Sequence, residues 1–301
     1  MNPPILLLPP DPSQIPAFRD AVLAVAPELE LIPWSRELDA ATLARVQVLL
    51  GWRLPPGLAP QLPALRWVCS IAAGVEKLLP PDLPPQIPMS RVVDPDQALG
   101  IAQHVALMVL RHARQLPLYD EQQRQHSWQR HPKAAARHRC AVLGFGEVGQ
   151  TVAATLSALG FPVEGWRRSS GPLLPLLARS EVVINALPLT PETSGLLNAQ
   201  AFAALPRGAY LINVARGGHV IEADLIAAVR SGQLAGAALD VQQTEPLPAD
   251  DPLWDVPGIL ITPHIAAQSS LDTVARQFVA GLQCLEQGRP LPNAVDRARG
   301  Y

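Results

Sequence analysis

The chain has 301 residues, 48% hydrophobic and 17% charged, so it is long enough for about two globular domains and its composition excludes a disordered chain. Lysine and arginine number 24 against 26 acidic residues, and this net charge of −2 argues against a nucleic-acid coat. The 33 prolines and 20 glycines together make up less than a fifth of the chain, below the level typical of low-complexity proteins.

The cysteines, Cys69, Cys140 and Cys284, are far apart and form no CxxC pair. This pattern predicts a reduced, intracellular protein without a zinc site or any other metal site. The first apolar run, Ile5–Leu8, is too short for a signal peptide and follows no basic segment. No stretch approaches the 18 apolar residues of a membrane span, so we expect a cytoplasmic protein without membrane contact.

Residues 1–96 contain short apolar runs separated by prolines and helical stretches. The runs are Ile5–Leu8, Val46–Leu50 and Trp67–Ile71, and Phe18–Ala26 is one of the helical stretches. Such alternation predicts a small α/β layer with parallel strands.

A long helix is predicted over residues 97–116, because apolar residues recur at spacings of three and four and no proline occurs before Pro117. The following polar stretch, 119–139, is rich in basic residues and histidines. It could be an anion-binding or nucleic-acid-binding patch, or a solvated linker and interface segment. The near-neutral charge of the whole chain favours the second interpretation.

From residue 140 onward, apolar strand runs alternate with helical segments, which predicts a doubly wound parallel sheet. An amphipathic helix follows Gln268. We therefore expect two Rossmann-like α/β domains with parallel sheets, in which a dinucleotide-binding domain (106–269) is inserted into a discontinuous substrate domain (1–105 plus 270–301). The predicted strands are 140–143, 162–166, 181–186, 209–214, 235–240 and 259–262.

A glycine-rich loop follows the first of these strands. Gly144, Gly146 and Gly149 form a GxGxxG pattern with a strand before it and a helix after it, the context that a dinucleotide site requires. The first glycine allows a tight turn, the second lets the backbone approach a pyrophosphate, and the third permits close helix packing. The helix N-terminus, with Glu147 and Val148, directs N–H groups at the phosphates. A glycine turn in another kind of α/β protein is the alternative.

The end of the second strand of this domain indicates which dinucleotide is bound. An NAD site usually has an acidic residue there to hold the ribose 2′-hydroxyl. This chain has Arg167, Arg168 and Ser169 instead, which suit a 2′-phosphate. We expect NADP(H) as the preferred cofactor, with NAD(H) possible. The alternative is that both arginines are ordinary surface residues.

Three polar side chains follow three later strands: Arg216, Glu245 and His264. Hydride transfer to a 2-keto acid creates an alkoxide that needs a proton, and a histidine can supply it near neutral pH. A glutamate beside the histidine would orient the ring and stabilise its charged form. An arginine can bind the substrate carboxylate and polarise the carbonyl. Taken singly, each has a structural alternative, as a turn histidine, a loop carboxylate or a surface ion pair.

Several stretches together resemble the D-isomer-specific 2-hydroxyacid dehydrogenases over essentially the whole chain. The family signatures are matched by 186–193, 213–217, 240–247 and 262–264. Further stretches resemble the subgroup that reduces glyoxylate and hydroxypyruvate, namely 51–53, 72–76, 166–169 and 295–301.

The resemblance implies site residues and an assembly. His264 would be the general acid, Glu245 its partner and Arg216 the substrate clamp, while Asp240 and the Val214 carbonyl would position the nicotinamide carboxamide. It also implies a homodimer formed through the 97–116 helix and the arm with Trp128, and a product of D configuration. Further cofactor contacts would come from Leu187, Pro188 and Thr193, and substrate contacts from Trp52, Arg53, Ala73 and Gly74; core packing is the alternative for Trp52.

Two other functions remain open at this point. The substrate could be a bulkier 2-keto acid such as phenylpyruvate, or the protein could be a cofactor-sensing binding protein, like the corepressors that share this fold. Slow turnover despite tight NADPH binding would identify a sensor. The chain departs from the family at Ala266–Ala267, where relatives often have two glycines, so the nicotinamide pocket is expected to be tighter.

Overall fold

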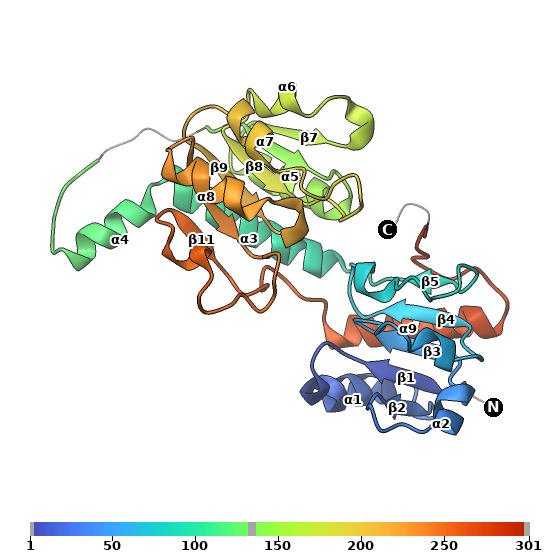
Figure 1. Ribbon diagram of the computed structural model, residues 1–301. Coiled ribbons are helices and arrows are strands. Elements are labelled where there is room, and N and C mark those ends of the chain that lie inside the picture. The colour runs from blue at the N-terminus through green and yellow to red at the C-terminus, as the bar shows by residue number, and fades with distance from the viewer. Residues whose placement is uncertain (1–2, 132–136, 298–301) are drawn as a thin grey trace. The chain divides into compact units, whose positions relative to one another are not determined.

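The computed structural model describes residues 3–131 and 137–297, which form two compact units. Unit 1 consists of Met1–Pro95 and Gln268–Tyr301, and unit 2 consists of Asp96–Ala267. The chain thus passes between the units at 95/96 and 267/268. The boundaries predicted from the sequence are 105/106 and 269/270. Each unit is an α/β layer structure of its own (Figure 1).

Unit 1 contains a five-stranded sheet in the order β2-β1-β3-β4-β5, in which all strand pairs are parallel. The strands are β1 (Ile5–Leu8), β2 (Leu31–Pro33), β3 (Val48–Gly51), β4 (Trp67–Ser70) and β5 (Met89–Ser90). The helices are η1 (Pro12–Gln14), α1 (Ile15–Val25), α2 (Ala40–Arg45), η2 (Ala59–Gln61), η3 (Glu76–Leu78) and α9 (Leu271–Glu286). The apolar runs predicted β1, β3 and β4, but the two short edge strands were not predicted.

Both faces of this sheet are buried, because successive side chains of a strand point to opposite sides. Ile5 and Leu7 belong to the cluster that includes α1 and α9, whereas Leu6 and Leu8 belong to the cluster on the other face. On the α9 side, Trp67 stacks on Phe278 with ring centroids 5.3 Å apart. The last helix therefore completes the core formed by the first third of the chain.

Unit 2 contains a six-stranded sheet in the order β11-β10-β9-β8-β6-β7, also parallel throughout. The strands are β6 (Cys140–Leu143), β7 (Val163–Trp166), β8 (Val182–Asn185), β9 (Ala209–Asn213), β10 (Leu234–Leu239) and β11 (Ile259–Ile261). The helices are α3 (Pro95–Ala113), α4 (Leu116–Arg124), α5 (Glu147–Ala158), η4 (Arg168–Ser170), α6 (Leu174–Leu177), α7 (Ala199–Ala204), η5 (Gly217–His219), α8 (Glu222–Arg230) and η6 (Pro252–Asp255). All six strands lie where the sequence predicts them, and the chain order reverses direction between β6 and β8, which is where such sheets bind ligands.

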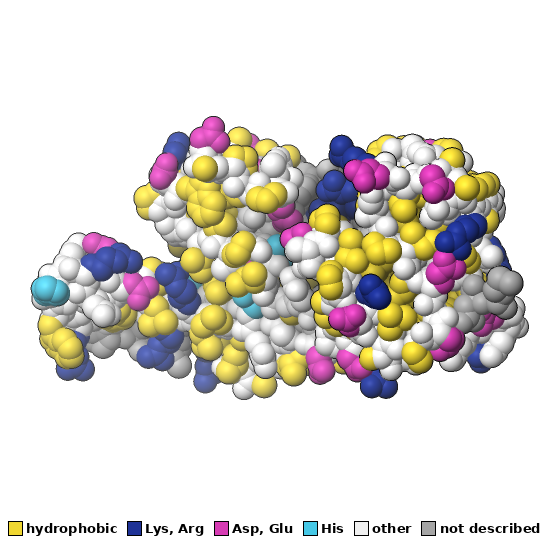
Figure 2. Space-filling model, turned by 90° about the horizontal axis from the view of Figure 1, so that it is seen from below, with side chains coloured by type: hydrophobic (Ala, Val, Ile, Leu, Met, Phe, Trp, Pro, Cys, Tyr) yellow, Lys and Arg dark blue, Asp and Glu magenta, His cyan; other side chains and the backbone are white. Residues whose placement is uncertain are grey.

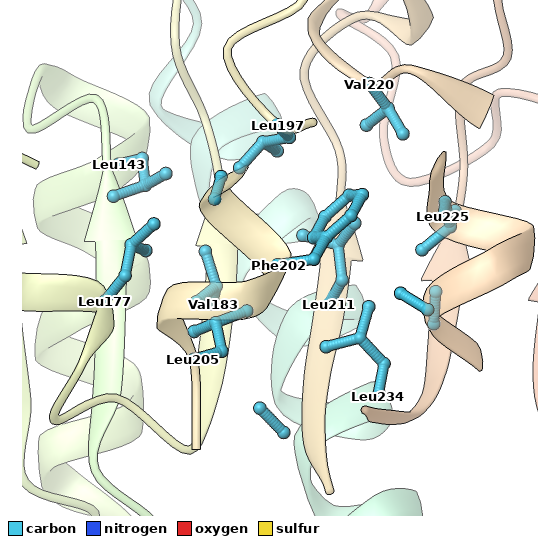
Figure 3. Close-up of a cluster of buried hydrophobic side chains, with 14 of the residues drawn as sticks. Leu143, Leu177, Val183, Leu197, Phe202, Leu205, Leu211, Val220, Leu225 and Leu234 are labelled. Atoms are coloured by element: carbon cyan, nitrogen blue, oxygen red, sulfur yellow. The ribbon is translucent and has the colours of Figure 1, made fainter. Parts of the chain in front are cut away.

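Helices cover both faces of this sheet, so its strands are apolar on both sides. Figure 3 shows Phe202 of α7 beside Leu211 of β9, and Leu225 of α8 belongs to the same cluster on that face. The cluster on the other face combines α3 and α5 with the alternate strand residues, such as Val142 and Ile212. The predicted fold class of two parallel α/β domains is confirmed.

The long helix predicted over 97–116 ends earlier than expected. α3 ends at Ala113, Gln115 adopts a left-handed φ of 55°, and α4 then begins at Leu116. Pro117 explains the break, because in a continuous helix its ring would clash with the carbonyl oxygen four residues earlier, whereas in the first turn of a new helix it is tolerated. Figure 1 shows α4 carrying the chain away from the sheet of unit 2.

Two sequence interpretations fall partly outside the described residues: the basic segment 119–139, at residues 132–136, and the C-terminal tail, at residues 298–301. The described part of the tail is anchored by Arg297, whose guanidinium donates to the carbonyls of Leu83, Pro84 and Ile87 in unit 1. Among the described helices, none has the length and apolar character needed to cross a bilayer.

Candidate active site

The glycine-rich loop joins β6 to α5 and is packed so closely that side chains are excluded from it. Gly144 has a φ of +91°, and a Cβ there would lie 2.4 Å from the Ala186 carbonyl oxygen. A Cβ on Gly149 would lie 1.9 Å from the Gly144 oxygen. At Gly146, in contrast, a Cβ would meet no described atom within 4 Å. The loop is therefore tight toward the protein and open at the position where a pyrophosphate would approach the helix N-terminus.

The open side of the loop also suits an anion electrostatically. Gly146 is the N-cap of α5, and since a glycine has no side chain, the N-cap residue itself does not cap that helix end. Backbone N–H groups at such an end provide hydrogen-bond donors and a partial positive charge. The carboxylate of Glu147 in the first turn opposes an anion, but its side chain is exposed to solvent, which weakens that repulsion. The residues present thus fit a dinucleotide, with the pyrophosphate at the Gly146 end.

The end of β7 is fastened to the glycine loop by Arg167. Its guanidinium donates from Nε and Nη2 to the Phe145 carbonyl oxygen at 3.0 and 2.6 Å, and it lies 5.8 Å from the centre of the Phe145 ring. That ring in turn lies against Gly165, where a Cβ would be 2.1 Å from a ring atom. Arg167 therefore links the end of β7 to the glycine-rich loop through its side chain.

The neighbouring Arg168 makes a different contact. Its Nη1 lies 3.3 Å from a carboxylate oxygen of Glu192, and both side chains are more than half exposed. The same carboxylate oxygen accepts a hydrogen bond from the Thr190 hydroxyl at 2.7 Å, which holds the pKa of Glu192 below its usual range. Glu192 is therefore ionised at neutral pH.

Buried asparagines link the loops that follow β8 and β9. Asn185 and Asn213, both without exposed surface, form a side-chain hydrogen bond of 2.9 Å. The Asn185 side chain accepts from the Leu187 amide, and Asn213 donates to the Arg216 carbonyl. The pair fixes the Leu187 loop and the Arg216 turn relative to each other.

A buried histidine adds a second link between the same two loops. The Nδ1 atom of His219 lies 3.0 Å from the Arg216 carbonyl oxygen, and its Nε2 lies 3.2 Å from the Pro188 carbonyl oxygen. The side chain has no exposed surface. His219 thus holds the backbone of Arg216 against the Pro188 loop, and we infer that it is a positioning residue.

His264 and Glu245, predicted as a pair, are brought together. The His264 Nδ1 lies 3.0 Å from a Glu245 carboxylate oxygen, with 36% and 25% of the two side chains exposed. Since an ionised carboxylate only accepts, this contact assigns a proton to Nδ1 and leaves Nε2 for a substrate. His264 also has a φ of +55°, uncommon for a residue other than glycine and more often found at functional sites.

Asp240 holds the turn that carries His264. Its carboxylate, only 2% exposed, accepts from the Thr262 hydroxyl at 2.6 Å and from the amides of Ile265 and Ala266 at 2.9 Å each. Its carbonyl accepts from the His264 amide. Asp240 therefore maintains the strained backbone at His264, a function beyond the nicotinamide contact that the sequence suggests.

Ala267, one of the two alanines that replace the family's glycines, packs against Gly100 of α3. A Cβ on Gly100 of α3 would lie 2.8 Å from the Ala267 Cβ. The methyl group of Ala267 is thus accommodated against the helix at a glycine. The tighter nicotinamide pocket expected from Ala266 and Ala267 stays a prediction.

All these side chains of unit 2 lie at one edge of its sheet. Arg216, Asp240 and His264 follow the carboxyl ends of β9, β10 and β11, which are neighbours, and the glycine loop follows β6. Parallel strands end at the same edge of a sheet, so motifs that follow successive strands in the sequence lie next to one another along that edge.

Unit 1 has its own row of predicted residues. Trp52 and Arg53 follow β3, and Ala73 and Gly74 follow the adjacent β4. The buried Ser70 shapes the second turn, because its hydroxyl donates to the Gly74 carbonyl and accepts from the Ala72 amide. Trp52 packs against the core and is also covered by Lys77, whose Nζ is 5.2 Å from the ring centre.

Four supporting residues of the site were not predicted as site residues: Ser70, Asn185, Asn213 and His219. Ser70, Asn185 and Asn213 are buried polar residues at the last position of an apolar strand, and the buried His219 ends η5, six residues after β9. That position was the available signal, because a polar group buried there must be hydrogen-bonded to neighbouring loops.

A glycine loop at the switch point of a doubly wound sheet, with a His–Glu pair and an arginine at the same edge, is the arrangement of an NAD(P)-dependent oxidoreductase. Residues 106–266, more than half of the chain, match the family model described as D-isomer specific 2-hydroxyacid dehydrogenase, NAD binding domain. The chain belongs to the D-isomer-specific 2-hydroxyacid dehydrogenases, and the family expected from its sequence is confirmed.

Individual members of this family are similar to the chain over most of its length. The glyoxylate/hydroxypyruvate reductase A of Yersinia enterocolitica is 37% identical over 271 residues, which are 84% of this chain and 87% of that protein. The structure of a D-isomer specific 2-hydroxyacid dehydrogenase from Xanthobacter autotrophicus in complex with NADPH and MES is 38% identical, covers 100% of both chains and has a TM-score of 0.89. An NADPH-dependent glyoxylate/hydroxypyruvate reductase from Sinorhizobium meliloti, solved with NADP and sulfate, is 32% identical, covers 99% of both chains and also has a TM-score of 0.89.

Proposed function

We propose that this protein catalyses the NADPH-dependent reduction of glyoxylate and hydroxypyruvate to the corresponding 2-hydroxy acids. The observation that carries the proposal is the 3.0 Å contact between His264 and Glu245 at the sheet edge that also bears the glycine loop. The names of the relatives from Yersinia enterocolitica and Sinorhizobium meliloti support the choice of substrates and cofactor.

The catalytic residues of the proposal are Arg216, Glu245 and His264. Glu245 accepts the Nδ1 proton of His264, so that Nε2 can carry the proton destined for the substrate oxygen. The Arg216 guanidinium binds the substrate carboxylate and polarises the keto group. When bound, the reduced dinucleotide is the source of the hydride that adds to the keto carbon. The proton from His264 completes the hydroxyl group.

The cofactor would be held by the edge of unit 2. We assign the pyrophosphate to the loop of Gly144, Gly146 and Gly149, where the helix end is open. Glu147 and Val148 would contribute backbone N–H groups there, and Asp240 with the Val214 carbonyl would position the nicotinamide carboxamide. The ribose phosphate would meet Arg167, Arg168 and Ser169, and Leu187, Pro188 and Thr193 complete the proposed cofactor contacts.

We propose the turn of Ala73 and Gly74 as a receptor for the substrate carboxylate, and Trp52 and Arg53 as further substrate-binding residues. Small residues allow a ligand to approach backbone N–H groups closely. The two hydrogen bonds made by Ser70 support this assignment, since they fix the turn in one conformation.

We also propose a homodimer formed through α3 and the arm, residues 114–131. Both expose large apolar side chains: Leu107 is 56% exposed and Trp128 is 93% exposed. Figure 2 shows hydrophobic side chains on the projecting arm, at the left of the view. Burying such surface in a symmetric contact is favourable. Light scattering should give twice the 32.3 kDa chain mass, and a monomer mass would contradict the dimer.

A cytoplasmic location also belongs to the proposal. Its support is that all three cysteines are free thiols, as expected in a reducing compartment. Burial raises the pKa of both the Cys69 and the Cys140 thiol to about 12, so these two are unreactive.

The test is initial-rate reduction of glyoxylate and hydroxypyruvate with NADPH and NADH compared side by side. We expect rapid turnover and a lower KM for NADPH. Turnover that favours NADH would remove the assignment of the arginines but keep the catalytic residues. Cofactor binding without turnover of either substrate would contradict the proposal and would direct the assays to bulkier keto acids and to a sensor function.

A further inference from the structure

The two arginines after β7 are in different situations, although the sequence presents them as equivalent. Arg167 already donates twice to the Phe145 carbonyl and lies over the Phe145 ring. Arg168 interacts with Glu192 at 3.3 Å, and 54% of its side chain is exposed. Of the two arginines, Arg168 is thus the one that forms an ion pair with an exposed carboxylate.

Glu192 is held in place by its own loop. The Thr190 hydroxyl donates to its carboxylate at 2.7 Å. The Thr190 amide in turn donates to the Thr193 hydroxyl, which donates to the Pro188 carbonyl. A defined negative charge therefore stands beside the arginine that the 2′-phosphate of NADPH would use.

We propose that Glu192 sets the cofactor preference by competing with the 2′-phosphate for Arg168. The inference rests on the proposed NADPH site and adds a specificity-determining residue to it. A phosphate monoester carries a charge of about −1.5 to −2 at neutral pH, so a carboxylate on the same guanidinium repels it. The 2′-hydroxyl of NADH carries no charge and meets no such repulsion.

The exposure of the pair explains why both cofactors could bind. An ion pair between exposed side chains is weak, so a phosphate can replace Glu192 at little cost. With NADH, the pair persists and Arg168 keeps a partner. Glu192 therefore reduces the advantage of NADPH without abolishing it.

The experiment compares Glu192→Gln with a matched control, Glu164→Gln. Glu164 lies on β7 and pairs with Arg179 through both carboxylate oxygens at 2.6 and 3.0 Å, so its substitution removes the same charge from a different ion pair of unit 2. Calorimetry with adenosine 2′,5′-bisphosphate and with AMP measures binding at the 2′ position without turnover. We expect Glu192→Gln to bind the bisphosphate about three to ten times more tightly. Neither variant should change AMP binding, and the control should change neither affinity.

Other outcomes separate this inference from the proposed function. If the wild-type protein binds the bisphosphate no more tightly than AMP, the NADPH proposal itself fails. If the wild-type protein shows that preference but Glu192→Gln leaves it unchanged, only the competition is overturned. If Glu192→Gln weakens bisphosphate binding, the competition is likewise overturned, and Glu192 would instead orient Arg168. In the Glu192→Gln background, Arg168→Ala should abolish the gain; a gain that persists would also overturn the competition.

Discussion

Replacing His264 by asparagine should lower kcat for glyoxylate reduction by at least about a hundredfold, because the alkoxide loses its proton donor. The affinity for NADPH should stay within about twofold, since the proposed phosphate contacts lie on other loops. Asparagine is chosen because His264 has a φ of +55°, a region that asparagine tolerates better than alanine does. Stopped-flow reduction and a separate fluorescence titration of NADPH measure the two quantities.

A matched control tests whether the backbone rather than the imidazole is responsible. His126, an exposed residue after α4, has a φ of +51°, so His126→Asn makes the same exchange in the same backbone region. It should leave kcat unchanged. A near-native rate in His264→Asn would remove that histidine from the proton-donor role.

The strands and loops that carry the site can be predicted from the sequence, because each is specified by residues close together in the chain. The strand β6, the glycines after it and the helix α5 occur within twenty residues, and each element constrains the next. Arg216, Asp240 and His264 could be placed at one edge for a similar reason, since parallel strands have a fixed direction. The contact between His264 and Glu245 then follows from loops that start on adjacent strands.

Other features depend on contacts between distant segments and so have no local signal. Arg167 and Arg168 are adjacent in sequence, yet one is turned to the Phe145 carbonyl and the other to Glu192, 24 positions further along the chain. The short strands β2 and β5 are defined by pairing with neighbours rather than by their own apolar runs. The break at Gln115 reflects a proline two residues later, whose effect is to restart a helix rather than to end one.

Replacing Arg216 by lysine should lower kcat/KM for glyoxylate about ten- to a hundredfold, mainly through KM. A lysine keeps the charge but loses the planar fork that can donate two parallel hydrogen bonds to a carboxylate. Losing the second of two charge-assisted hydrogen bonds costs about 1.5–3 kcal/mol, which corresponds to this factor. The measurement is the steady-state dependence of rate on glyoxylate at saturating NADPH.

The design of this experiment must separate the side chain of Arg216 from its backbone, which supports other groups. Its carbonyl accepts from Asn213 and lies 3.0 Å from His219 Nδ1, and these contacts survive a change of side chain. Arg207→Lys, an exposed arginine of the same unit that donates to the Ser231 carbonyl, is the matched control and should be neutral. In Arg216→Ala, added guanidinium ion should restore part of the rate. If it does not, and if Arg216→Lys has a normal KM, Arg216 does not bind the substrate carboxylate, and the proposed Ala73–Gly74 turn would have to bind it without Arg216.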